Sequence, residues 1–176
     1  LYIFLMSGNF KSLEGMRIPN LKGIATLAFI ILAIQIFLGV WTSTNYASLA
    51  CADFPTCQGT YFPEMDFKNG FNMAQEVGPN YLYGLLDNPA RVAIHYSHRV
   101  TAILVTIVFI ILMSKLWFTP AAPLASTLGI LLLTQISLGI INVVYVLPLY
   151  IAIAHNLIAA TLLATMFLVN YLAWKK

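Results

Sequence analysis

The sequence predicts an all-α membrane protein, a bundle of four transmembrane helices formed by two repeated hairpins. Sixty per cent of the 176 residues are hydrophobic and only 9% are charged, whereas soluble domains carry about 25% charged residues. Four stretches reach the length of about 20 apolar residues that a helical span needs. The sequence does not show the alternation typical of barrel strands, so each span is expected to be a helix that satisfies its own backbone hydrogen bonds.

The four spans are expected at residues 24–43, 92–112, 124–146 and 149–173. They form hairpin one (24–112), with a long outer loop at 44–90, and hairpin two (124–173), within a single membrane domain over 1–176. The first ten residues lack an initiator Met and the basic region of a signal peptide. We interpret them as the end of an earlier span, and the chain as the C-terminal part of a longer protein; the alternative is a short interfacial helix at a true terminus.

The basic residues predict the orientation of the spans. Basic residues gather in the segments on one side of the membrane: Lys11, Arg17, Lys22, Lys115, Lys175 and Lys176. By the positive-inside rule this side, with both termini, is the cytoplasm. Five of the six acidic residues lie in the loop 44–90, on the opposite side. The net charge of +3 therefore reflects membrane topology; lipid is the expected environment, and no nucleic-acid partner is indicated.

An internal repeat relates the two hairpins. "QIFLGV" at 35–40 and "QISLGI" at 135–140 share Gln, Ile, Leu and Gly at the same spacing. "HRVTAILVTIVF" and "HNLIAATLLATMF", in the second and fourth spans, each begin with a histidine. Both hairpins start in the cytoplasm, so they are expected to be parallel repeats. The equivalent positions that we interpret as helix-packing or cross-helix hydrogen-bonding residues are Gly39, Gly139, Gln35 and Gln135.

His98 and His155 are predicted to be the axial ligands of a heme iron. His98 follows Arg91 by seven residues and His155 follows Leu149 by six, which at ~1.5 Å per residue places both roughly 10 Å below the outer surface. Their spans run in the same direction, so two neutral imidazoles can flank one iron. An acceptor for each outer ring nitrogen is expected but not identified by the sequence. The alternative is a paired polar network, because isolated ionisable groups are costly in a membrane.

Three further residues are candidates for contact with the heme edge or its propionates: His95, Arg99 and Arg91. His95 lies on nearly the same helix face as His98. Its alternative role, as a third ligand in a zinc or copper centre, lacks a Cys or carboxylate at matching depth. Arg99 keeps its charge and needs an anion or polar partners, of which a propionate is one. Arg91 can reach a propionate or the lipid headgroups. No catalytic residue is expected in this segment.

The outer loop contains the two cysteines, in "CADFPTC". A disulfide between Cys51 and Cys57 is the default in an oxidising compartment, and both a structural clamp and thiol exchange with a partner remain open. The rest of the loop is expected to cover the outer helix ends as a lid. Its aromatic residues are Tyr61, Phe62, Phe67, Phe71, Tyr81 and Tyr83.

An ordered set of motifs over about residues 20–175 completes the sequence pattern. They are "LGVWTSTNYASLACADFPTCQG", "PEMDF", "LLDNPARVAIHYSHR" and "QISLGIINVVYVLPLYIAIAHNL". Together they resemble the C-terminal half of the heme A synthase family, in its proteobacterial and mitochondrial branch. The resemblance implies one half of an eight-helix pseudo-symmetric fold in the bacterial inner membrane, with loop 44–90 periplasmic.

The resemblance also implies a function. The family oxidises the C8 methyl of heme O to the formyl of heme A for cytochrome oxidase assembly. His98 and His155 match its heme b ligands, and Cys51 and Cys57 its outer-loop disulfide. The heme O site belongs to the N-terminal half, which this sequence does not match, so the segment alone is expected to be inactive and to supply electron transfer through heme b. Heme O synthase and oxidase assembly factors are expected partners. Alternatives are a stand-alone four-helix cytochrome b and a heme-free transporter or assembly protein.

Overall fold

A computed structural model of the chain describes residues 16–74 and 85–175. A 3-10 turn η1 (Pro19–Leu21) leads into α3 (Lys22–Thr44), and α4 (Phe67–Gly70), α5 (Asn88–Leu116), α6 (Ala122–Val144) and α7 (Leu149–Trp174) follow. The four helices α3, α5, α6 and α7 are long and apolar enough to cross a membrane, which confirms the predicted class of a four-helix membrane bundle. The interpretation of the first ten residues, and the expectations for Tyr81 and Tyr83, fall outside the described residues.

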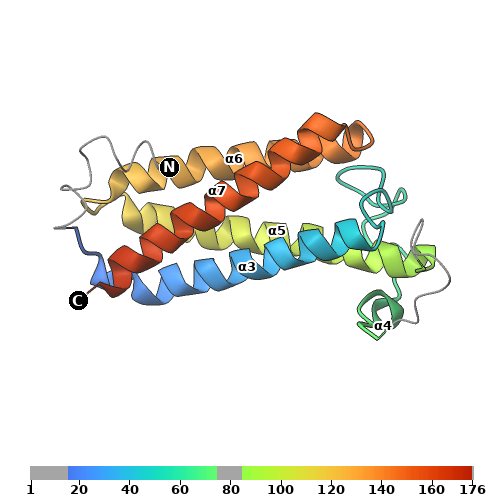
Figure 1. Ribbon diagram of the computed structural model, residues 1–176, viewed down its shortest axis with the longest axis horizontal. Helices are drawn as coiled ribbons and strands as arrows, with labels where there is room; N and C mark the ends of the chain where they lie inside the picture. Colours follow the sequence, from blue (N-terminus) through green and yellow to red (C-terminus); the bar gives the residue numbers. More distant parts are fainter. Residues whose placement is uncertain (1–15, 75–84, 176) are drawn as a thin grey trace.

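The four long helices form an antiparallel bundle (Figure 1). Both α5 and α7 pack against α3 and against α6. Consequently α5 and α7 occupy diagonal positions and run in the same direction. Only 17–22% of the most apolar window of each span is buried inside the bundle, so most of each span's apolar surface faces outward, as expected for helices in lipid.

Proline marks the start of three of these helices. Pro89 and Pro123 occupy the first turns of α5 and α6, and Pro148 caps α7. Proline suits these positions because its fixed φ matches the helix and the first-turn N–H groups have no intrahelical acceptor. The helix α5 begins at Asn88 and ends at Leu116, four residues beyond the predicted span on each side. Its first turns project past the other helices toward the outer loop (Figure 1).

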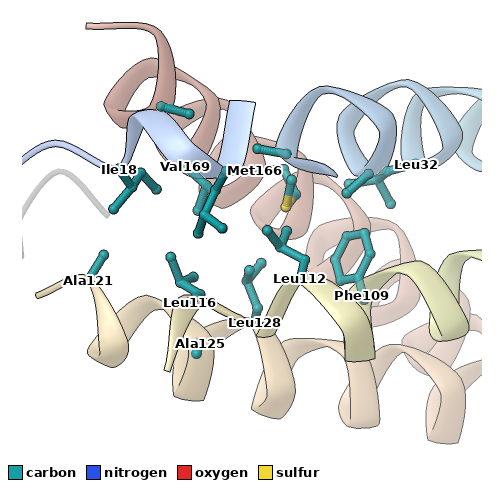
Figure 2. Packing of buried hydrophobic residues seen from close by; sticks show 14 of the residues in the cluster. Ile18, Leu32, Phe109, Leu112, Leu116, Ala121, Ala125, Leu128, Met166 and Val169 are labelled. Atoms are coloured by element: carbon teal, nitrogen blue, oxygen red, sulfur yellow. The ribbon is translucent and has the colours of Figure 1, made fainter. Parts of the chain in front are cut away.

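The apolar core lies in the half of the bundle that contains the helix starts of α3 and α6. Phe109, Leu112 and Leu116 from α5 point toward Met166 and Val169 from α7, and Leu128 of α6 lies beside them (Figure 2). All of these are fully buried. Lipid tails are as apolar as these side chains, so the packing is stabilised by close van der Waals contact rather than by removal from water.

Beyond this core the bundle has a layer in which no residue of the four helices is fully buried. Within the described structure, the longest stretch of each helix without a buried residue is 33–37 in α3, 96–104 in α5, 133–141 in α6 and 149–161 in α7. Each stretch contains one of the repeat-equivalent polar residues Gln35, His98, Gln135 and His155. We refer to this region as the polar layer. It lies between the core and the outer loop.

The outer loop packs mainly on the projecting end of α5. Gly70 of α4 lies so close to α5 that a Cβ on it would come 2.7 Å from the carbonyl oxygen of Ala90. The indole of Trp41, near the end of α3, donates a 2.9 Å hydrogen bond to the Gly70 oxygen. The hydroxyl of Tyr96 donates a 3.0 Å hydrogen bond to the Tyr61 oxygen. These contacts join the loop to both helices of the first hairpin.

Candidate functional site

His98 lies in the polar layer against two residues of α3. The side-chain nitrogen of Gln35 is 3.1 Å from His98 Nδ1 and 3.3 Å from Nε2, so the amide can donate to whichever ring nitrogen lacks a proton. Gly39, one turn further along α3, leaves room for the ring. A Cβ at this position would lie 3.1 Å from His98 Cε1. The α3 surface therefore fixes the position of this imidazole through one amide and one glycine.

His155 has the same environment in the second hairpin. The side-chain nitrogen of Gln135 on α6 is 3.1 Å from His155 Nε2, and a Cβ on Gly139 would lie 3.3 Å from His155 Cε1. The two sites differ in one contact: the Gln35 amide lies near both ring nitrogens of His98, whereas the Gln135 amide reaches only Nε2 of His155. The repeat noticed in the sequence is thus a repeat of one structural unit, an imidazole packed against the Gln and Gly of the preceding helix.

The two imidazoles lie at the same depth in the bundle. Gly39 precedes the last residue of α3, Thr44, by five residues, and Gly139 precedes the last residue of α6, Val144, by five. At ~1.5 Å per residue, both glycines are about 7.5 Å below the outer helix ends. The rings that contact them belong to the diagonal helices α5 and α7.

Three polar atoms of this layer have no hydrogen-bond partner among the described residues. They are the side-chain oxygens of Gln35 and Gln135 and the Nδ1 atom of His155, and all three are buried from solvent. A buried polar group without a partner costs about 1–3 kcal/mol, and native proteins contain few of them. The layer therefore has hydrogen-bonding capacity that the described part of the chain does not use.

His95 has a different environment from His98, although it lies one turn away. It is only 4% exposed, and its Nδ1 donates a 3.0 Å hydrogen bond to the Ala47 oxygen. Its Nε2 accepts a 3.2 Å hydrogen bond from Nε of Arg99. Both nitrogens are thus occupied, which requires the neutral tautomer with the proton on Nδ1. No group of three or more His, Cys, Asp or Glu residues suited to a metal ion occurs within residues 16–74 and 85–175.

Arg99 connects α5 to the segment around the disulfide, residues 51–62, which we refer to as the cysteine loop. Besides its bond to His95, it donates hydrogen bonds of 2.8 Å to the Thr56 oxygen and 2.7 Å to the Cys51 oxygen. Its guanidinium also lies 5.8 Å from the centre of the Phe54 ring. The planar guanidinium can serve several acceptors at once because its five N–H groups point in fixed directions. Arg99 is therefore one anchor of the cysteine loop, beside the Tyr96 hydroxyl and the packing of Val92 against the disulfide.

Cys51 and Cys57 form the expected disulfide, with their Cα atoms 4.6 Å apart. Exchange at an exposed disulfide was one alternative from the sequence. Both cysteines are in fact buried, at 0% and 2% exposure, so a partner thiol would reach the sulfurs only after the loop opened. The burial of both cysteines therefore favours a structural role for the disulfide over thiol exchange.

The ring closed by this disulfide is organised around Asp53. Its carboxylate accepts hydrogen bonds from the hydroxyl of Thr56 and from the backbone N–H groups of Gln58, at 2.6 Å, and Gly59, at 3.0 Å. These bonds, chiefly those from Thr56 and Gly59, lower the pKa of Asp53 from 3.8 to about 2. Gly59 has a φ of +75°, which glycine adopts without steric cost.

Arg91, the remaining predicted site residue, lies in the second turn of α5. Its Nε atom is buried and has no partner among the described residues. Its predicted contact with a propionate stays a prediction, as do the heme-edge roles of His95 and Arg99. The residues that sequence reasoning undervalued are Gln35 and Gln135. Their signal is the "QIxLG" repeat; its interpretation as cross-helix hydrogen bonding is confirmed, but the sequence does not say that the partners are the two histidines.

Fold and site together define a multi-pass, all-α membrane protein with paired histidines inside its helical bundle and a disulfide-clamped outer loop. Comparison with protein families then identifies it more closely. The family model described as cytochrome oxidase assembly protein matches residues 3–167, and the chain belongs to this family. This confirms the family resemblance of the sequence motifs.

Individual relatives carry a more specific name. The chain is 40% identical over 160 residues to the heme A synthase of Shewanella oneidensis, covering 90% of this chain and 48% of the relative. It is 30% identical over 164 residues to that of Methylobacterium radiotolerans, covering 92% and 42%. For the heme A synthase of Rickettsia felis the values are 33% over 141 residues, 78% and 38%. The chain spans about half the length of the curated relatives it matches, and no solved structure matches it significantly.

Proposed function

We propose that this chain holds a heme b between His98 and His155 and forms the heme b-binding, C-terminal half of a heme A synthase. The observation that carries the proposal is the pair of imidazoles at equal depth on diagonal helices, within a layer where no residue of these helices is fully buried. The relatives are named heme A synthases and are about twice as long as the matched region, which is consistent with one half of a duplicated protein.

The residues of the polar layer fit a heme. Two imidazoles at one level supply the ligand set of a six-coordinate b-type heme. The unpartnered oxygens of Gln35 and Gln135 can accept hydrogen bonds from the ring N–H groups of such ligands. The surrounding positions of the layer are mainly apolar. A heme bound here would supply one-electron transfer between its ferrous and ferric states. The chain itself would provide ligation, orientation and exclusion of water.

The complete reaction would need more than this segment. We propose that the whole protein is an oxidoreductase that converts the C8 methyl of heme O to the formyl of heme A, and that the segment alone is inactive. Heme O would bind in the other half, and heme O synthase and oxidase assembly factors would be partners. The cysteine loop would face the periplasm and the core end the cytoplasm of a bacterial inner membrane.

A reduced-minus-oxidised spectrum of the purified full chain tests the heme assignment. We expect a low-spin b-type signal that His98→Ala or His155→Ala abolishes, because each removes one axial ligand. His95→Ala serves as the matched control on the same helix and should keep the signal, since both nitrogens of His95 bond within the chain. A signal that survives the His98 and His155 substitutions, or that only His95→Ala removes, would overturn the proposal.

A further inference from the structure

We propose that Gln35 and Gln135 orient His98 and His155 as heme ligands and set the electron-donating strength of each imidazole. This inference rests on the proposed heme-binding function. It assigns a role to two residues that would otherwise count as helix packing, and it uses the unpartnered oxygens of both Gln side chains.

Each Gln acts together with a glycine one turn away. Gln35 and Gly39, like Gln135 and Gly139, are four residues apart and therefore share a helix face. The ring rests against the glycine, where a Cβ would come within 3.1 Å of His98 or 3.3 Å of His155. The carboxamide reaches ring nitrogens at 3.1 Å in both hairpins. The glycine thus fixes where the ring lies, and the carboxamide selects which nitrogen it holds.

A carboxamide can serve a histidine in two protonation states. Its NH₂ group donates to a ring nitrogen that carries a lone pair, and its oxygen accepts from a ring N–H. The two groups are similar in size, so a half-turn of the amide exchanges them. An imidazole that gives one lone pair to iron keeps its proton on the other nitrogen, and that N–H normally has an acceptor. The unpartnered oxygens of Gln35 and Gln135 are the acceptors that the described structure offers.

The bond has a predictable effect on the heme. A hydrogen bond accepted from the ring N–H makes the imidazole a stronger electron donor, which stabilises ferric iron and lowers the reduction potential. Removing the acceptor should raise the potential and weaken heme binding; loss of such an outer hydrogen bond typically costs about 10–100-fold in affinity. Because the two hairpins repeat the same unit, both substitutions should shift the potential in the same direction.

The test is a redox titration of the purified full chain, together with the rate of heme loss to an apoprotein acceptor. Gln35→Leu and Gln135→Leu should each raise the potential and release heme about 10-fold faster or more. Gln35→Glu and Gln135→Glu keep an acceptor oxygen and should not raise the potential. The matched controls are Ser43→Ala on α3 and Thr127→Ala on α6, which lie outside the polar layer and whose hydroxyls bond to carbonyls of their own helices. They should leave both quantities unchanged.

Two failures can be told apart. If the wild-type chain shows no low-spin b heme, the proposed function is wrong and the inference falls with it. If the wild type binds heme and the Leu variants keep its potential and its rate of heme loss, only the inference is overturned. Should the Leu variants fail to fold, the Glu variants decide, since a potential at or below that of the wild type supports the inference and a higher one refutes it.

Discussion

His95 and His98 lie one turn apart on α5, and their nitrogens are used differently. His95 donates to the Ala47 oxygen and accepts from Arg99, so it holds the chain that leads out of α3. Among the described residues, the ring nitrogens of His98 bond only to the Gln35 amide, so one of them can serve a ligand. Arg99 follows His98 directly, but its side chain binds the cysteine loop. His95 and Arg99 thus bind the outer loop, whereas His98, between them in the sequence, faces the polar layer.

Replacing Arg99 should loosen the cysteine loop. Arg99→Lys keeps the charge but loses the forked hydrogen bonds to the Thr56 and Cys51 oxygens. Loss of charge-assisted bonds worth about 2 kcal/mol would favour local opening about 30-fold. We expect correspondingly faster reduction of the disulfide by a small thiol, measured by alkylation of released cysteines. Arg91→Lys is the control, since the Nε atom of Arg91 has no partner among the described residues. An unchanged rate in Arg99→Lys would refute the anchoring role.

The Asp53 ring should lose order in acid. Hydrogen bonds lower the pKa of Asp53 to about 2, below that of an Asp in an open loop. As the pH falls from about 4 to 2, Asp53 is therefore protonated in the open form of the loop before it is protonated in the closed form. The carboxylate bonds thus stabilise the closed form above this window, and the stabilisation is lost as the pH falls through it. We expect the amide exchange protection of Gln58 and Gly59, measured in detergent, to fall across the window and to stay constant from pH 5 to 8. In Asp53→Asn the drop should vanish; a pH-independent wild type would contradict this.

At the scale of elements, the spans were predictable and their ends and neighbours were less so. Hydropathy located all four, but α5 begins at Asn88 rather than 92 because polar residues continue the helix beyond the apolar stretch. The short helix α4 was missed, since its single turn depends on the Asp66 cap and contact with α5. The repeat predicted that His98 and His155 form a pair. It could not predict what Gln35 faces, because periodicity gives a helix face and not the neighbour against it.

The two site glycines allow a test with controls on the same helices. A methyl group at Gly39 or Gly139 would press on a histidine ring, at 3.1 or 3.3 Å, and such overpacking costs about 1–3 kcal/mol. Gly39→Ala and Gly139→Ala should therefore lose heme, the former more severely. On the same helices, Gly23 has no atom within 4 Å and Gly129 has Met113 at 3.6 Å. Gly23→Ala and Gly129→Ala should bind heme normally. Heme retention after gel filtration measures the effect; equal retention in all four would exclude the packing role.

At the scale of the whole molecule, stability and chemistry occupy different ends of the bundle. The apolar core joins all four long helices at one end, and the polar layer and the disulfide loop occupy the other. Substitutions in the polar layer should thus affect ligand binding more than folding. The segregation also predicts that the two ends meet different compartments.

Two exposed phenylalanines provide a test of orientation. Phe62 in the cysteine loop is 83% exposed, and Phe118 in the turn between α5 and α6 is 88% exposed. In intact bacterial cells, a membrane-impermeant maleimide should label Phe62→Cys, whereas Phe118→Cys should react only after permeabilisation. The native cysteines are bridged and do not compete. Labelling of Phe118→Cys in intact cells would reverse the proposed topology.

Because α5 contacts the cysteine loop at one end and the core at the other, the number of residues between these two contacts is fixed. Arg99 must face the cysteine loop while Phe109, ten residues later, faces the core. Successive helical residues are about 100° apart, so inserting one residue between them would leave hydropathy unchanged and still turn one end out of phase with the other. Substitutions in this stretch can be tolerated if they stay apolar. Insertions and deletions cannot, and the helical phase is as much part of the site as the histidines.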